Sequence, residues 1–214
     1  MSYRVNAAVL KSSDHCASRA LFMRAFVDSL PVLMGYTTMG FVAGVLLAAK
    51  GEVVLSPLWA FLTSSLWVTG TMSFAVVPEV AARSPFWTVA LMTLAVNFRY
   101  AFYGFSMLGR WTSVSFWRKA YLILMLTDEN YALECASPIK DQKRYLKYCT
   151  KLSLLNHAYW VSGVTVGALT VWLLGKAIDA SIIRRATNGM EFAMVALFLV
   201  IFTDQMKGFF SHGK

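Results

Sequence analysis

One arginine stands inside an apolar run of this chain, and its side chain is the first candidate for chemistry. The stretch TLAVNFRYAFYGF, residues 93–105, places Arg99 two positions after Asn97 among aromatic and aliphatic residues. A guanidinium binds a carboxylate through two parallel hydrogen bonds, so Arg99 is suited to clamp a carboxylate substrate or to hold a gating carboxylate. The alternatives are an arginine that extends to a polar surface from near a helix end, and a purely structural ion pair.

The position of Asn97 relative to Arg99 sets a condition on the local backbone. At 100° per residue, two positions along a helix correspond to a rotation of about 200°, so the two side chains point in nearly opposite directions. A break in the helix near residues 97–100 would let both side chains face one cavity. The sequence therefore predicts a shared site for Asn97 and Arg99 only if the helix is interrupted there.

Two adjacent carboxylates interrupt a later apolar stretch, LTDENYALE, residues 126–134. Neighbouring residues lie about 100° apart on a helix, so either Asp128 or Glu129 can face Arg99 while the other points elsewhere. Thr127 is also a good N-cap, and acidic residues suit the first turn of a helix for purely structural reasons. A helix that restarts at Thr127 within the membrane would nevertheless resemble the discontinuous helices with which transporters build binding sites.

Small residues in three further stretches are candidates for close packing or for substrate contact. VTGTMSF, residues 68–74, indicates either packing between helices or a local unwinding whose backbone contacts substrate. The pairs Gly40/Gly44 and Gly163/Gly167 match the small-xxx-small pattern, which we interpret as helix packing only.

Two other polar residues in apolar surroundings favour structural roles. Glu191 follows Asn188 by three residues, which is typical of a capping box at the start of a helix. His157 lies near the start of a predicted apolar segment, where a hydrogen-bonding role at a helix end is favoured over a proton relay.

The composition of the chain defines the environment of these residues. The 214 residues are 57% hydrophobic and 14% charged, with a mean hydropathy of +0.55, whereas soluble domains are about 45–50% apolar and about 25% charged. The sequence therefore predicts an all-α integral membrane protein. The net charge of +9 fits basic residues that flank apolar spans, so no nucleic-acid partner is expected.

Prolines, glycines and charged residues divide the chain into a polar cytoplasmic segment, residues 1–24, and one transmembrane domain, residues 25–214. About six hydrophobic helical segments are predicted in that domain, some of them broken at mid-membrane. An interfacial helix is also expected near residues 19–28. The six segments are approximately residues 26–49, 57–77, 85–108, 119–136, 152–174 and 190–202, with a basic loop at 140–151.

The distribution of basic residues predicts the orientation. With the N-terminus inside, the inner face holds twelve Lys and Arg residues against seven on the outer face, in agreement with the positive-inside rule. No Walker, HExxH or GxGxxG sequence is present, and the three cysteines have no metal-ligand or CxxC spacing. We therefore expect neither an enzyme nor a bound cofactor or metal.

These segments, in this order, resemble the AzlC-type family, the large subunit of branched-chain amino acid exporters associated with azaleucine resistance. The resemblance rests on PVLMGYTTMGFVAG, NFRYAFYG, LTDENYA, WVSGVTVGA and GMEFAMVALF, and it extends from about residue 26 to residue 204. It implies a multi-pass protein of a prokaryotic cytoplasmic (inner) membrane. It also implies proton-coupled export of leucine, isoleucine, valine and similar amino acids, together with a small hydrophobic AzlD-type subunit.

On this basis Arg99 and Asn97 are expected to bind the substrate, and Asp128 or Glu129 to couple it to protons. Arg99 would hold the substrate carboxylate in one state and Asp128 or Glu129 in the other. The apolar tail of the substrate would fit against small residues, namely Gly35, Gly70, Thr71 and Ser73.

Two departures from the family pattern affect this expectation. Ser73 stands where the family often has a glutamine, and many relatives continue with further apolar sequence, so either this is a short member or a C-terminal portion is missing. The competing hypotheses are a membrane subunit whose buried charges serve assembly, and a transporter of another zwitterion or an organic anion.

Overall fold

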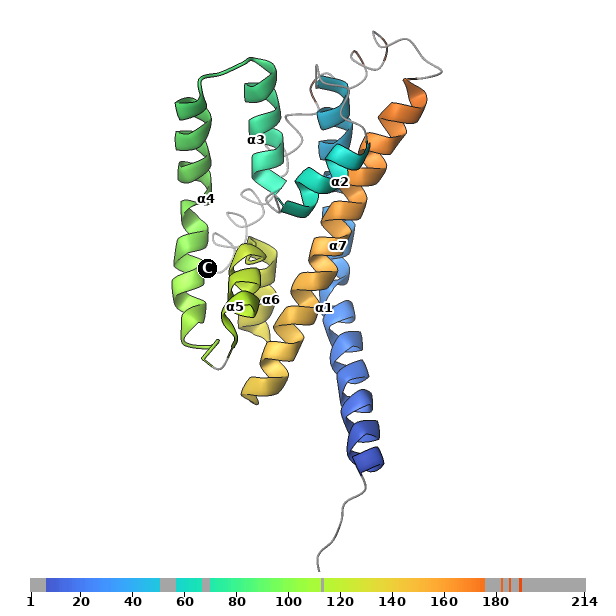
Figure 1. The fold of residues 1–214 in the computed structure, drawn as a ribbon, viewed down its shortest axis with the longest axis vertical. Helices are drawn as coiled ribbons and strands as arrows, with labels where there is room; N and C mark the ends of the chain where they lie inside the picture. Colours follow the sequence, from blue (N-terminus) through green and yellow to red (C-terminus); the bar gives the residue numbers. More distant parts are fainter. Residues whose placement is uncertain are drawn as a thin grey trace, which may run out of the picture. The chain divides into compact units, whose positions relative to one another are not determined.

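A computed structural model describes residues 7–50, 57–66, 70–112 and 114–175, together with the single residues 182, 185 and 189. Within these ranges the regular structure is helical, and no strand occurs. Figure 1 shows the helices in chain order. They are α1 (Ala7–Lys50), α2 (Pro57–Leu66), α3 (Gly70–Ala81), α4 (Phe86–Leu108), α5 (Phe116–Leu124), α6 (Asp128–Ala136) and α7 (Gln142–Leu174).

The helix boundaries agree with some of the predicted segments and correct others. The third segment coincides with α4. The fourth segment is divided into two helices, and the chain restarts after Thr127 as the N-cap interpretation of that residue allowed, because α5 ends at Leu124 and α6 begins at Asp128. The predicted basic loop at 140–151 is wrong, since α7 starts at Gln142 and its first turns carry these basic residues. The segment at 190–202, with Glu191, lies outside the described residues.

The α1 and α3 helices also differ from the predicted segments at their ends. Because α1 is continuous from Ala7 to Lys50, residues 19–28 belong to the same helix as the first apolar segment rather than to a separate interfacial helix. In the second segment, α3 continues beyond the predicted end at Val77 through Pro78 and Glu79 to Ala81. A proline inside a helix removes one backbone hydrogen bond, but it does not by itself end the helix.

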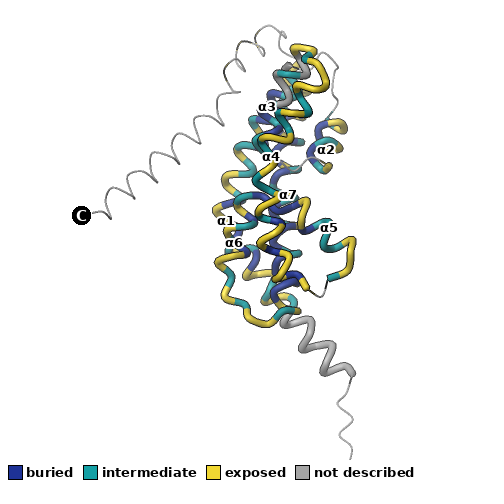
Figure 2. The backbone as a smooth tube through the Cα atoms, turned by 90° about the vertical axis from the view of Figure 1, so that its left-hand side faces the viewer, coloured by how far each residue is buried: buried dark blue, intermediate teal, exposed yellow. Residues whose placement is uncertain are grey.

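Two of the described helices are long and apolar enough to cross a bilayer, over Ser18–Ala49 and Gln142–Leu174. Large apolar side chains are exposed on other helices as well, for example Phe86 and Phe105 of α4 and Leu58 of α2. Figure 2 shows that exposed residues alternate with buried ones along the helices. Apolar surfaces of this kind suit a lipid environment, whereas the predicted count of six spans and the cytoplasmic N-terminus stay predictions.

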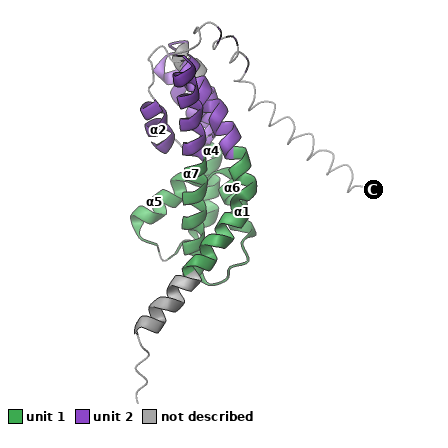
Figure 3. Cartoon of the chain, turned by 90° about the vertical axis from the view of Figure 1, so that its right-hand side faces the viewer, with its two compact units in different colours: residues 1–35, 98–159 green, residues 36–97, 160–214 purple. Residues whose placement is uncertain are grey.

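The chain divides into two compact units, which Figure 3 distinguishes. Unit 1 contains residues 1–35 and 98–159, and unit 2 contains residues 36–97 and 160–214. The long helices α1, α4 and α7 each contribute to both units, because the boundaries fall at Gly35, Asn97 and Tyr159.

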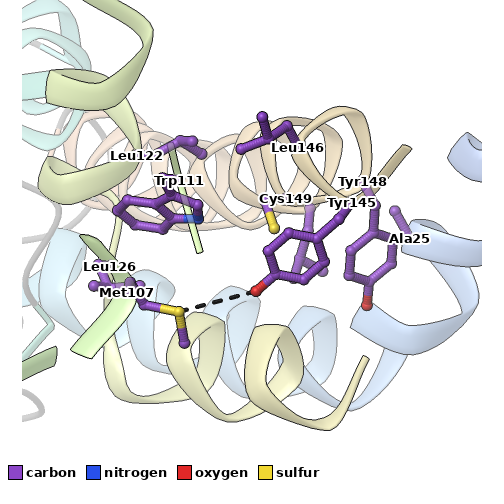
Figure 4. Close-up of a cluster of buried hydrophobic side chains, with 10 residues drawn as sticks. Ala25, Met107, Trp111, Leu122, Leu126, Tyr145, Leu146, Tyr148 and Cys149 are labelled. Atoms are coloured by element: carbon purple, nitrogen blue, oxygen red, sulfur yellow. Dashed lines mark hydrogen bonds between the residues drawn. The ribbon is translucent and has the colours of Figure 1, made fainter. Parts of the chain in front are cut away.

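The core of unit 1 forms where the first half of α7 meets the other helices of that unit. Trp111, Tyr148 and Leu152 are buried in it almost completely. Figure 4 shows the sulfur of Cys149 beside the rings of Tyr145 and Trp111. The whole cluster consists of Ala25, Met107, Trp111, Leu122, Leu126, Tyr145, Leu146, Tyr148, Cys149 and Leu152.

In unit 2, α1 packs against α7 through glycines, as their spacing predicted. A Cβ atom added at Gly44 would lie 2.0 Å from the carbonyl oxygen of Val164, and one at Gly167 would lie 2.1 Å from the carbonyl oxygen of Phe41. The backbones of the two helices can approach this closely only because neither position carries a side chain. The packing interpretation of these glycines is confirmed.

Substitution of Gly44 by alanine is therefore expected to destabilise the protein. The added methyl group would meet backbone atoms, which cannot move aside as a side chain can, and the cost should be about 1–3 kcal/mol or more. Thermal unfolding in detergent would measure it. Gly104→Ala of α4 is the matched control, because its Cβ has no atom within 4 Å, and equal stability of the two variants would contradict the packing assignment.

Candidate functional site

The guanidinium of Arg99 on α4 pairs with the carboxylate of Asp128 at the start of α6. The Nη1 atom of Arg99 lies 2.7 Å from Oδ2 of Asp128, and the two side chains are 31% and 36% exposed. Both residues belong to unit 1. The sequence offered Asp128 or Glu129 as the partner, and the structure shows Asp128 in contact with the guanidinium. A short contact between two charged groups is among the stronger polar interactions in proteins.

The break between α5 and α6 sets the position of Asp128. Met125 is the C-cap of α5, and Thr127 is the N-cap of α6, where its side-chain oxygen accepts a hydrogen bond from the backbone N–H of Asn130 at 3.4 Å. Asp128 is thus the first residue of α6, at the positive end of the helix dipole. The capping role of Thr127 and a functional role of Asp128 are compatible, because the cap holds the carboxylate at the helix start.

Asn130 ties this break to α7, and sequence reasoning assigned it no role. Its side-chain N–H₂ donates to the carbonyl oxygen of Met125, and its side-chain oxygen accepts from the amide of Asn156 on α7. Both asparagines are almost completely buried. A helix break leaves backbone groups without intrahelical partners, so an amide inside an apolar segment just after such a break is the signal that could have identified Asn130.

Loss of the side-chain amide of Asn156 is expected to destabilise the break between α5 and α6. Asn156→Ala removes the donor to Asn130 and leaves a buried acceptor unsatisfied, which typically costs about 1–3 kcal/mol. Thermal unfolding in detergent measures this cost, and Leu154→Ala is the control on the same helix because Leu154 is 53% exposed. If Asn156→Ala were as stable as the wild type, the contact between Asn156 and Asn130 would not stabilise the break between α5 and α6.

Tyrosines surround the ion pair. The guanidinium carbon of Arg99 lies 5.1 Å from the ring centroid of Tyr100, and its Nη2 donates to the Tyr100 hydroxyl at 3.4 Å. Tyr103 lies close enough to Asp128 to interact with its carboxylate, and it stacks on Tyr131 of α6 at 4.4 Å between centroids. These rings combine apolar surface with hydroxyl groups, so they shield the pair while they leave polar atoms near it.

The other predicted substrate residues lie on different elements. Asn97 is in the part of α4 that belongs to unit 2, and Gly70, Thr71 and Ser73 form the beginning of α3, also in unit 2. The interruption near residues 97–100 that a shared site would require does not occur, because α4 is continuous from Phe86 to Leu108. The backbone hydrogen bonds of an intact helix are retained there, so Asn97 and Arg99 keep opposite faces.

Gly35, Glu129 and His157 complete the set of polar or small residues singled out by the sequence. A Cβ atom at Gly35 would have no atom within 4 Å, so space is open beside it. Glu129 follows Asp128 on α6 and is exposed. His157 lies in the interior of α7 rather than near a helix start, and its Nδ1 is 3.4 Å from the hydroxyl of Tyr121.

The contacts around Arg99 and Asp128, together with the helical fold, define the kind of protein and the kind of site. In the residues that the structure describes, this is a helical membrane protein in which a guanidinium on the continuous helix α4 and a carboxylate at the start of α6 form an ion pair. A guanidinium of this kind is suited to bind a carboxylate.

The chain belongs to the AzlC family, whose sequence profile, described as AzlC protein, matches residues 31–174. An uncharacterized membrane protein of Helicobacter pylori (strain ATCC 700392 / 26695) is 34% identical over 89% of this chain and 80% of its own length. The branched-chain amino acid transport protein AzlC of Bacillus subtilis (strain 168) is 29% identical over 87% of this chain and 68% of its own length. The inner membrane protein YgaZ of Escherichia coli (strain K12) is 28% identical over 75% of this chain and 60% of its own length. No solved structure matches the chain.

Proposed function

We propose that this chain is the large subunit of a proton-coupled secondary transporter that exports branched-chain amino acids such as leucine, isoleucine and valine, with a net direction that follows the gradients of substrate and proton. The observation that carries the proposal is the contact between Arg99 and Asp128. A buried or half-buried charge in a membrane protein normally faces a partner or a transport pathway. Similarity to a relative named as a branched-chain amino acid transport protein supports the class of substrate.

The proposed mechanism is a competition between two carboxylates for one guanidinium. When Asp128 is ionised it pairs with Arg99, and when Asp128 takes up a proton the guanidinium is released to bind the carboxylate of the amino acid. Proton binding at Asp128 and substrate binding at Arg99 are therefore coupled without covalent chemistry.

The apolar tail of the substrate is proposed to lie against small residues. The open space beside Gly35 supports this, since a branched side chain could approach the backbone of α1 there. Asn97, Gly70, Thr71 and Ser73 remain candidates for substrate contact. An apolar pocket distinguishes two substrates whose side chains differ by one methylene by only about 1–3 kcal/mol of free energy. Several branched-chain amino acids would therefore be accepted.

A small hydrophobic AzlD-type subunit is proposed as the partner, in the inner membrane of a prokaryote. A different possibility is a subunit that does not transport and whose charges serve assembly. The pairing of Arg99 within its own chain favours the transporter, because this arginine then needs no carboxylate from a partner.

The experiment is uptake of labelled leucine and valine into inside-out vesicles that contain this chain, with and without the small subunit, under an imposed proton gradient. Accumulation that follows the gradient supports the proposal. No uptake under any gradient, from folded protein together with the small subunit, would favour the assembly subunit, and uptake of another zwitterion or an organic anion alone would reassign the substrate.

A further inference from the structure

The contact between α4 and α6 continues beyond the ion pair, along the same face of each helix. On α4, Tyr103 follows Arg99 by four residues. On α6, Tyr131 follows Asp128 by three residues. Residues three or four positions apart lie on one face of a helix, so each tyrosine lies one turn after a member of the ion pair. Within unit 1, the two helices therefore meet first through charges and then through aromatic rings.

The rings of Tyr103 and Tyr131 form a nearly parallel stack. Their centroids lie 4.4 Å apart, and their planes differ by 13°. The hydroxyl of Tyr131 also accepts a hydrogen bond from Oγ of Ser106 at 3.2 Å, which adds a contact one turn further along α4. Both rings are half-buried and pack against the hydrophobic core of unit 1. The stack thus joins α6 to α4 at a point that the core supports.

The ion pair is less suited than the stack to fix the rotation of α6. Solvent screens a pair whose side chains are about one third exposed, and holding two flexible side chains in one geometry costs conformational entropy. Because Tyr131 and Asp128 share a face, the contact that holds Tyr131 against α4 also directs Asp128 toward α4. Glu129 lies about 100° further round the helix and is exposed.

We infer that Tyr131 is a positioning residue of the transport site, whose stack on Tyr103 fixes the rotation of α6 at which Asp128 reaches Arg99. The inference rests on the proposed function, in which Asp128 competes with the substrate carboxylate for the guanidinium. Tyr131 acts through Asp128 and needs no contact with the substrate. Loss of its ring leaves both charges in the protein but weakens their pairing, so the substrate meets a weaker competitor.

The test is the KM for leucine in exchange between equal pools, which needs no net proton movement. The purified protein is reconstituted in lipid vesicles with the small subunit, under alkaline conditions that keep carboxyl groups ionised. Tyr131→Leu is expected to lower this KM by about two- to tenfold, the range that corresponds to the contribution of one aromatic pair. Tyr131→Phe keeps the ring and loses only the hydroxyl, so its KM should stay close to that of the wild type.

The Asp128→Asn background separates positioning from a merely structural effect. This variant has no charged competitor for Arg99, so its KM for leucine should already be low, and Tyr131→Leu should lower it no further. A residue that supports only the fold would change KM by the same factor in both backgrounds, because independent effects add as free energies. Equal factors in the two backgrounds would overturn the inference.

A matched control and the wild type separate this inference from the function on which it rests. Phe105→Leu removes an aromatic ring of α4 that is 73% exposed, and it should keep the KM of its background in both cases. If the wild type does not exchange leucine in the presence of the small subunit, the proposed function fails. If the wild type exchanges leucine and Tyr131→Leu has the same KM, the function stands and the inference is wrong.

Tyr103→Leu provides the same test from the other helix if Tyr131→Leu does not fold. It removes the stack from the side of α4, and it should lower the KM for leucine in the wild-type background and not in Asp128→Asn. Thermal unfolding in detergent identifies the folded variants. A folded Tyr103→Leu variant with the KM of the wild type would overturn the inference.

Discussion

Arg99→Gln is expected to abolish gradient-driven accumulation of leucine and valine while the protein still folds. Glutamine keeps hydrogen-bonding atoms at the site but removes the positive charge that attracts both the substrate carboxylate and Asp128. Truncation of one partner of a buried, hydrogen-bonded charge pair costs about 2–5 kcal/mol. Because this pair is 31% and 36% exposed, we expect a loss near the lower end of that range, about thirtyfold in affinity. Uptake into inside-out vesicles at several substrate concentrations measures this loss.

The controls for Arg99→Gln test charge and folding separately. Arg99→Lys keeps the charge but not the planar fork of donors, so it should transport better than the glutamine variant and less well than the wild type. Thermal unfolding in detergent shows whether each variant folds. Transport by Arg99→Gln at a rate near that of the wild type would refute the competition mechanism.

Asp128→Asn is expected to remove the dependence of transport on the proton gradient. An asparagine cannot bind and release a proton, and it leaves Arg99 without its carboxylate, so exchange between equal pools should continue while accumulation ceases. Because neutralisation of Asp128 also breaks the 2.7 Å contact between side chains that are 31% and 36% exposed, a loss of stability should accompany it that is smaller than the about 3–5 kcal/mol typical of a fully buried pair. Transport measured across a pH series, together with thermal unfolding, checks both parts.

Glu129→Gln is the matched control, since it removes the adjacent carboxylate of the same helix. We expect it to retain the pH dependence of the wild type. If Glu129→Gln loses this dependence and Asp128→Asn keeps it, the coupling residue is Glu129. If neither variant changes it, neither carboxylate couples protons to transport.

The break between α5 and α6 shows which structural features the residue pattern can predict. Thr127 followed by two acids and an asparagine is a local N-cap signal, and local signals of this kind act through backbone groups only a few residues away. The restart of the chain as α6 was therefore predictable. The continuity of α4 was not, because a polar residue such as Asn97 in an apolar run is compatible with an intact helix whose opposite faces meet different surroundings.

The same distinction applies to α7. Its first turns carry many basic residues, which suggested a loop, yet Tyr145, Tyr148 and Cys149 lie on one face and are buried against the core of unit 1. Long basic side chains on the opposite face stay exposed, so the segment is an amphipathic helix. A pattern with alternating basic and aromatic residues is ambiguous until the partner surface is known.

The membrane class, the family and the presence of an arginine and nearby carboxylates in apolar segments could be read from the residues alone, because these depend on composition and on local order. The contact between Asp128 and Arg99 and the complete burial of Glu134 depend on how the helices pack against one another, and the structure was needed to find them. The physical reason is rotation. Adjacent residues on a helix differ by about 100° in direction, and the rotation of α6 about its axis is set by its packing against distant parts of the chain.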